Sequence, residues 1–270
     1  MNLLEELNET QRLAVLNFSQ PLLIIAGPGS GKTRVIAYKI AYLLKEKPIS
    51  FNKILAVTFT NKAADEMRER VFALAGGRCE RVEVSTFHAL GSRILRKFSR
   101  PPLKTIFDRE DQINLLKQVL EDMDFKSSRE DAKRLVAKIS RAKMRLVYPE
   151  AEDYLLTMGF TPEEIAVYRH YQQRLENIYA ADFDDLISKV VLLLESNPQL
   201  RSFLQETYSY VLVDEFQDTD PLQTEIVFFL SERRGEFAGK WDDVNLVPGK
   251  LFLVGDPKQS IYGFRRADLD

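Results

Sequence analysis

One eight-residue segment constrains this chain more than any other feature of its sequence. Residues 26–33 read Ala-Gly-Pro-Gly-Ser-Gly-Lys-Thr, and they lie between an apolar run at residues 21–26 and a helical pattern at residues 33–45. Alternate glycines leave the backbone free to curl its N–H groups around an anion, and the start of a helix favours negative charge. The segment therefore predicts a phosphate-binding loop between a buried strand and a helix.

The last residues of this loop have the chemistry that a nucleoside triphosphate requires. Lys32 is placed to reach β- and γ-phosphate oxygens, and the Thr33 hydroxyl is a ligand for Mg²⁺. The strict Walker A pattern has glycine where this chain has Ala26. The alternative is a Gly/Pro-rich turn that only caps a helix. We expect nucleotide contacts from Ala26, Gly27, Pro28, Gly29, Ser30, Gly31, Lys32, Thr33 and Arg34.

Strand and helix patterns alternate on both sides of this loop. Continuous apolar runs are typical of parallel strands buried on both faces, and their alternation with helices predicts an α/β fold with a parallel sheet flanked by helices. The further runs lie at residues 54–58, 82–85, 210–213 and 251–254, and the further helical patterns of this part at residues 63–75 and 222–230.

One interval does not fit a simple crossover between strands. More than 120 residues separate the runs at 82–85 and 210–213, whereas a parallel crossover needs about a dozen. Its helical patterns lie at residues 109–120, 128–143, 161–179 and 184–194. We therefore expect a sheet domain made of residues 1–90 and 181–270, with an inserted all-helical subdomain at residues 91–180.

The charge of the chain is unevenly distributed. The formal net charge is −2, yet residues 91–145 hold 15 Lys/Arg and 8 Asp/Glu, a net of +7 that leaves −9 for the rest. Such a block attracts phosphate backbones, which makes nucleic acid a candidate partner. The alternative is a solvated helical surface.

Composition excludes several classes of protein. With 45% hydrophobic and 29% charged residues the chain is not a disordered one, and a lone Cys79 excludes an internal disulfide. The longest apolar runs are about five residues, far short of the roughly 20 that span a bilayer. Acidic first residues do not resemble a signal peptide. We expect a cytoplasmic protein without a membrane partner.

Two adjacent carboxylates follow the strand pattern at residues 210–213. Asp214 and Glu215 stand where the carboxyl end of a parallel strand binds ligands. Asp214 is suited to hold Mg²⁺ through water, and Glu215 to orient and deprotonate an attacking water. An ordinary acidic loop is the alternative.

Residues 213–219, Val-Asp-Glu-Phe-Gln-Asp-Thr, resemble the Walker B motif of superfamily 1 DNA helicases of the UvrD/Rep/PcrA type. The resemblance covers residues 7–268, and its other segments follow in the family's order at residues 7–11, 26–33, 58–64, 85–89, 182–186 and 254–265. It implies a RecA-like motor domain that uses ATP and Mg²⁺. It also implies a helicase or translocase that acts on single-stranded DNA or single-strand/duplex junctions in DNA repair or recombination.

The same resemblance implies roles for single residues. Gln11 reads the adenine edge, and Gln259 is a catalytic residue that senses the γ-phosphate. Tyr262 and Phe264 stack on bases, and such stacking tolerates any base. The alternative is that this aromatic turn only packs on a neighbouring domain. The implied nucleic-acid contacts are Phe59, Asn61, Thr86, His88, Tyr262, Phe264 and Arg265.

Some features depart from the UvrD/Rep pattern and leave alternatives open. Arg266 and the segment Asp256-Pro257-Lys258 look more like the RecB/AddA helicase–nuclease branch, and the loop at residues 231–250 is long. The helicase portion of such an enzyme, or a non-motor P-loop ATPase switch, are the alternatives. Family members continue into a second motor domain whose arginines complete the ATP site. We therefore expect this chain to be the N-terminal, ATP-binding half of a monomeric helicase that alone hydrolyses ATP very slowly.

Overall fold

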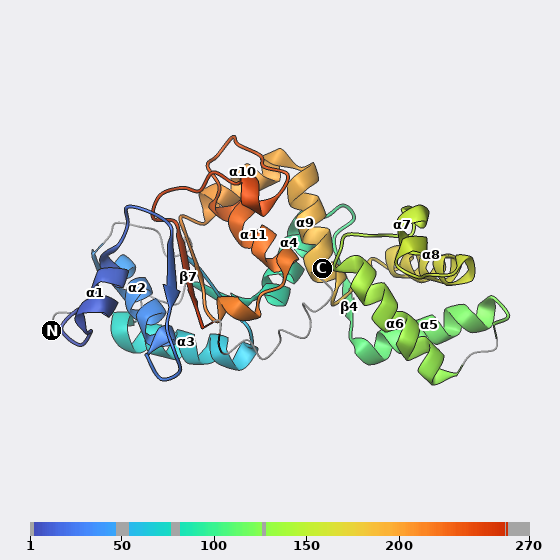
Figure 1. The fold of residues 1–270 in the computed structure, drawn as a ribbon, viewed down its shortest axis with the longest axis horizontal. Helices are drawn as coiled ribbons and strands as arrows, with labels where there is room; N and C mark the ends of the chain where they lie inside the picture. Colours follow the sequence, from blue (N-terminus) through green and yellow to red (C-terminus); the bar gives the residue numbers. More distant parts are fainter. Residues whose placement is uncertain (1–2, 47–53, 77–81, 126–127, 257, 259–270) are drawn as a thin grey trace. The chain divides into compact units, whose positions relative to one another are not determined.

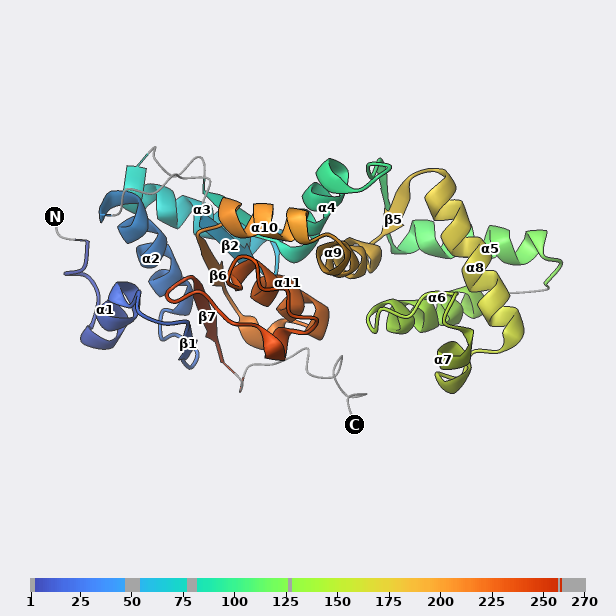
Figure 2. The same ribbon diagram turned by 90° about the horizontal axis from the view of Figure 1, so that it is seen from above.

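A computed structural model of the 270-residue chain describes residues 3–46, 54–76, 82–125, 128–256 and 258. It divides into two compact units (Figures 1 and 2). The sheet unit comprises Met1–Ala89 and Leu194–Asp270, and the helical unit comprises Leu90–Leu193. The second boundary lies beyond the predicted one at residue 180. Among the described residues, no helix combines the length and the apolar character that crossing a membrane requires.

The predicted parallel sheet is confirmed. Within the described residues of the sheet unit, five strands pair in the order β1-β7-β6-β2-β3, and every pairing is parallel. The register pairs Ile25 with Gly255 and Val57 with Val213, so the carboxyl ends of the strands share one edge. The bounds are β1 Leu22–Ile25, β2 Ile54–Thr58, β3 Glu83–Thr86, β6 Tyr210–Val213 and β7 Leu251–Gly255.

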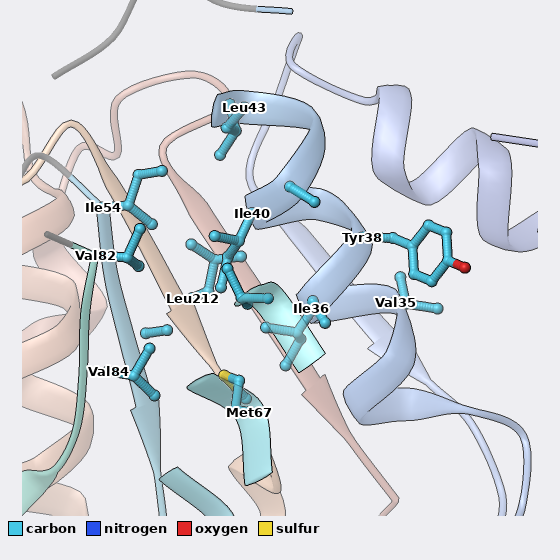
Figure 3. Packing of buried hydrophobic residues seen from close by; sticks show 14 of the residues in the cluster. Val35, Ile36, Tyr38, Ile40, Leu43, Ile54, Met67, Val82, Val84 and Leu212 are labelled. Carbon is cyan, nitrogen blue, oxygen red and sulfur yellow. The ribbon is translucent and has the colours of Figure 1, made fainter. Parts of the chain in front are cut away.

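Helices cover both faces of this sheet (Figures 1 and 2). On one face lie α1 (Glu9–Leu16), α2 (Lys32–Glu46) and α3 (Asn61–Ala75); on the other lie α10 (Pro198–Thr207) and α11 (Pro221–Ser231). Figure 3 shows Ile36 and Ile40 pointing from α2 toward the strands, near Leu212, whereas Tyr38 points away from them. Burial of this apolar face of α2 fixes the helix that follows the phosphate loop against the sheet.

The expectation that the first strand is buried on both faces is wrong. Leu23 and Ile25 are 53% and 68% exposed, while Leu22 and Ile24 pack against the core cluster of the sheet unit. In the described sheet β1 is an edge strand beside β7. An apolar run does not reveal whether its strand lies at the centre or at the edge of a sheet, and this accounts for the error.

The helical unit contains the predicted helices and also a small sheet that the sequence did not indicate. β4 (Thr105–Phe107) and β5 (Ala180–Asp182) pair in parallel, and three residues are too few to show a strand period. Side-chain capping boxes at Asp108, Ser128 and Thr161 begin α5, α6 and α8. The helices are α4 Phe87–Phe98, α5 Arg109–Asp122, α6 Arg129–Lys143, α7 Glu152–Thr157, α8 Pro162–Asn177 and α9 Asp185–Ser196.

A buried ionic network joins α6 to β5 and α9. Lys143 is fully buried, and its Nζ lies 2.7 Å from Asp182 Oδ2 and 2.9 Å from Asp185 Oδ1. The Tyr171 hydroxyl donates to Asp182 at 2.8 Å, and that of Tyr148 donates to Asp185 at 3.0 Å. Burial opposes the charge of the lysine, yet the two carboxylates hold the pKa of Lys143 above its ordinary value. Lys143 is therefore charged in the folded protein.

Replacing Lys143 with methionine should destabilise the helical unit. Methionine keeps the length of the side chain but leaves Asp182 buried without its cation and Asp185 with Lys189 alone, whose Nζ is 3.6 Å from Asp185 Oδ2. Removing one partner of a buried pair costs about 3–5 kcal/mol. Urea denaturation followed by circular dichroism measures the loss. The control Lys133→Met removes an exposed lysine of α6 that pairs with Glu130, and its effect should stay within about 0.5 kcal/mol. Equal effects of the two changes would show that the network does not stabilise the unit.

Candidate nucleotide-binding site

Three loops meet at the carboxyl edge of the sheet. The backbone N–H of Ala26 donates to Gly255 O at 3.1 Å, and that of Asp214 donates to Val57 O at 2.9 Å. These bonds extend the strand ladders by one residue and fix where each loop begins. The phosphate loop, the acidic turn at residues 214–219 and the segment after β7 therefore start side by side, at the edge where parallel sheets bind ligands.

The phosphate loop needs its glycines. Gly29 and Gly31 have φ of +73° and +84°, a backbone region that side chains other than glycine rarely adopt. Ser30 closes the turn, since its N–H and its hydroxyl both donate to Gly27 O, at 3.3 and 2.6 Å. The Val35 N–H then donates to Gly31 O at 3.0 Å and begins the helical ladder of α2. The loop therefore presents its N–H groups at the start of a helix.

Lys32 and Glu215, predicted from two separate motifs, lie together. The Lys32 side chain is 7% exposed, and its Nζ is 3.8 Å from Glu215 Oε2. Glu215 has a left-handed backbone with φ of +51°, a conformation that costs a residue other than glycine of order 1 kcal/mol. Strain of this kind is found most often at functional sites. The pair places a cation and a carboxylate from opposite loops at one point.

Asp214 and Thr33 form a second contact between the same loops. Burial raises the pKa of the Asp214 carboxyl to about 6, and a hydrogen bond with the Thr33 side chain opposes the rise. Both side chains offer hard oxygen donors, which are the ligands that Mg²⁺ prefers. The donor set therefore fits the predicted magnesium ligands.

Gln11 and Arg34 already have protein partners beside the loop. Gln11 Nε2 donates to Ser30 O at 3.1 Å, while its Oε1 accepts from the Asn8 N–H at 3.2 Å and caps α1. Arg34 Nη2 donates to Glu6 O at 2.8 Å. The structure thus attaches α1 to the phosphate loop through the residue predicted to read adenine, whose contact with a base stays a prediction.

The predicted DNA contacts are spread over the next loops of the sheet. Phe59 is half-buried after β2, and Asn61 is exposed at the first turn of α3. Thr86 ends β3, and its hydroxyl accepts from the Ala89 N–H at 3.2 Å, which caps α4. His88 is half-buried in the first turn of α4. The remaining predicted residues, Gln259, Tyr262, Phe264 and Arg265, lie outside the described residues.

Gln217 is a site residue that the sequence reasoning missed. Its Nε2 donates to Glu215 Oε2 at 2.8 Å, and its Oε1 accepts from the Asp256 N–H at 2.8 Å. A Cβ at Gly255 would lie only 2.7 Å from that Oε1. Gln217 therefore links the acidic turn to the segment after β7. Its position inside the acidic motif is evident in the sequence, but only the charged residues of that motif were predicted to be functional.

A phosphate loop after the edge strand and paired carboxylates after the central strand of a parallel sheet define a RecA-like domain of the P-loop class. The chain belongs to the family described as UvrD/REP helicase N-terminal domain, whose profile matches residues 7–270. The predicted resemblance is confirmed.

Curated relatives agree with this family. The chain is 39% identical over 279 residues to ATP-dependent DNA helicase UvrD1 of Mycobacterium bovis, and 41% identical over 276 residues to ATP-dependent DNA helicase PcrA of Staphylococcus aureus. Each match covers 99% of this chain and 35% of the relative. The chain therefore spans about a third of the length of these relatives.

The Asp214 carboxyl should titrate near pH 6, well above an ordinary aspartate, because burial disfavours its charged form. Carbon-detected NMR of the side-chain carboxyl measures the midpoint. Thr33→Val removes the hydroxyl that stabilises the carboxylate, so the midpoint should rise further. Thr157→Val changes a hydroxyl of the helical unit that donates to Tyr154 O and should leave it unchanged. A midpoint near 4 in the unaltered protein would contradict this account of the site.

Proposed function

We propose that this chain is the ATP-binding portion of an ATP-dependent DNA helicase or translocase that acts on single-stranded DNA, or on single-strand/duplex junctions, in DNA repair or recombination. The observation that carries the proposal is the meeting of Lys32 and Glu215, at 3.8 Å, beside the Thr33–Asp214 contact. The relatives' names support it.

In the proposed mechanism, the N–H groups of the loop and the Lys32 ammonium bind the β- and γ-phosphates of ATP. Thr33 and Asp214 would hold Mg²⁺, which when bound neutralises charge on the phosphate oxygens. A phosphate that draws Lys32 away from Glu215 leaves the Glu215 carboxylate to orient a water and accept its proton. Gln217 positions that carboxylate through its 2.8 Å hydrogen bond. Gln11 and Arg34 beside the loop, and Gln259 as γ-phosphate sensor, remain proposed nucleotide contacts.

The position of the basic residues along the chain points to one part of the basic block as the DNA-binding part. On α5 and α6, Lys117 pairs with Glu121, Arg129 with Glu110 and Lys133 with Glu130. The helix α4, which carries the predicted DNA contact His88 in its first turn, has the exposed cations Arg96 and Lys97 in its last turn, and the exposed Arg100 follows it. We infer that these three contact the DNA backbone. In the sheet unit, Phe59, Asn61, Thr86 and His88 remain proposed DNA contacts.

Two alternatives to this function stay open. The segment at residues 256–258 favours the helicase portion of a RecB/AddA-like helicase–nuclease. A P-loop ATPase that serves as a switch would share the nucleotide site but would not bind single-stranded DNA. A monomeric state and a cytoplasmic location stay predictions.

Lys32→Ala should weaken ATP binding at least tenfold, or about 1.4 kcal/mol, because it removes the buried cation that faces the terminal phosphates. Isothermal titration calorimetry with MgATP measures the change. Lys45→Ala removes an exposed lysine near the other end of α2 and should leave the affinity unchanged. Equal affinity of the Lys32 variant and the unaltered protein would refute the assignment of the phosphate loop.

Replacing Arg96, Lys97 and Arg100 together with alanine should flatten the salt dependence of single-stranded DNA binding. Each phosphate contact contributes about −0.7 to the slope of log K against log salt, so three contacts account for about −2. Fluorescence anisotropy with a labelled oligothymidine at several salt concentrations measures the slope.

The matched control replaces Lys117, Arg129 and Lys133, which changes the net charge by the same amount but removes cations already paired with carboxylates. Its slope should stay close to that of the unaltered protein. If both triple variants lower the slope equally, general charge and not this part of the basic block binds DNA.

A further inference from the structure

A cavity of about 340 Å³ lies in the helical unit. Its volume falls within the roughly 300–1,000 Å³ of sites that bind small organic groups. It is lined by the last turn of α4, the segment after α4, the end of α8, β5 and α9. The apolar part of its wall is made of Leu95, Pro101, Leu103, Ala180 and Ala181. Such a wall favours an occupant that brings apolar surface out of water.

Charged side chains stand on the same wall, and most of those from the described residues are cations. Arg100 is exposed and Lys189 is half-buried, while the carboxylate is that of Glu176, near the end of α8. Lys189 also pairs with the buried Asp185, since its Nζ lies 3.6 Å from Asp185 Oδ2. An occupant of the cavity therefore has positive charge beside it, in addition to an apolar wall.

The aromatic residue at the cavity has a strained backbone. Tyr179 lines the cavity, is 40% exposed and has φ of +56° just after α8. Glycine is usual at this position after a helix, because bulky side chains are sterically disfavoured there. Contacts of the ring must offset that cost, and the Lys104 ammonium lies over the ring, 4.5 Å from its centroid. Strain of this kind is found most often where ligands bind, which makes the Tyr179 ring a candidate contact of the occupant.

A nucleotide of single-stranded DNA combines the properties that this wall selects. Its base is a flat ring that stacks on aromatic side chains, and its phosphates carry negative charge close to the base. Arg100 lines the cavity and is also one of the three cations proposed to contact the DNA backbone. We propose that the cavity takes up one base of the single strand whose phosphates contact Arg96, Lys97 and Arg100. This inference rests on the proposed function in DNA binding.

A base pocket in the helical unit distinguishes single strands from duplex DNA. A base inside a duplex is stacked and paired, so its entry into the cavity costs the free energy of unstacking and unpairing. A base of a single strand has no pairing to lose. Because every base has a face that can stack, the pocket accepts any sequence.

Fluorescence anisotropy tests the proposal with two labelled strands of equal length, oligothymidine and the same strand with abasic sites throughout its central part. Both strands carry the same phosphates, so the ratio of their affinities measures what the bases contribute. Tyr179→Gly removes the ring and suits a left-handed backbone, so the fold is kept. The ratio should fall about fivefold or more, because one base loses its stacking partner. Tyr154→Ala removes an exposed tyrosine of α7 in the same unit and should leave the ratio unchanged.

The outcomes separate this inference from the proposed function. A chain that binds neither strand overturns both. Binding of oligothymidine with a ratio that Tyr179→Gly leaves unaltered overturns the base pocket alone. Equal falls in Tyr179→Gly and Tyr154→Ala also overturn the base pocket, because the cavity would then contribute no more than an exposed ring elsewhere.

A second measurement shows whether the base enters the cavity or only touches its rim. Leu103 is 9% exposed, so its methyl groups report on the wall of the cavity. Their NMR signals should shift when oligothymidine is added and should not shift with the abasic strand at equal saturation. Val167 is buried in the same unit but does not line the cavity, and its signals should stay in place with both strands. Leu103 signals that respond equally to both strands, or to neither, overturn the proposal.

Discussion

The parallel register of β1, β7 and β6 is the constraint on which the rest of this site depends. Because Ile25 lies opposite Gly255 and Val213 opposite Leu253, three chain segments leave the sheet at the same edge, within two residues of one another along the strands. The phosphate loop and the acidic turn are about 180 residues apart in the sequence, so local preferences do not bring them together. The pairing of the strands brings them together, and a shift of one residue in the register would place Lys32 and Glu215 at different heights.

The two adjacent carboxylates of the acidic turn differ in environment, and this difference separates their proposed tasks. Asp214 is 5% exposed, and burial raises its pKa, while Thr33 supplies a compensating hydrogen bond. The Glu215 side chain is 36% exposed, pairs with the Lys32 ammonium and accepts a hydrogen bond from Gln217. A buried carboxyl held against a hydroxyl suits ion binding, whereas a partly exposed one suits contact with water. The left-handed turn at Glu215 sends the two side chains into these different surroundings.

Sequence patterns predicted most of the framework because the strands are apolar and the helices are long and periodic. The phosphate loop and the acidic turn could be found because their residue types are dictated by chemistry at fixed spacing. The exposed face of β1, by contrast, depends on which strand becomes its neighbour, and no pattern within residues 22–25 contains that information. The same holds for α1, where Val15 alone is fully buried, so no apolar stripe marks the helix.

Site details that depend on hydrogen bonds between distant segments were also beyond the sequence. Gln217 was visible inside the acidic motif, yet its link to Asp256 exists only because β6 and β7 are neighbours. Its hydrogen bonds, rather than its residue type, distinguish Gln217.

At Glu215 the left-handed backbone lowers the stability of the protein, whereas the side chain is needed for the proposed chemistry. Glycine there would relieve of order 1 kcal/mol of backbone strain, and the acidic turn would become easier to form. The same change would delete the carboxylate that faces Lys32. A selection for thermal resistance alone would therefore favour a variant that has lost the proposed base, while a selection for turnover would keep the strained residue. Glu215 is thus a position where the most stable sequence and the working sequence differ.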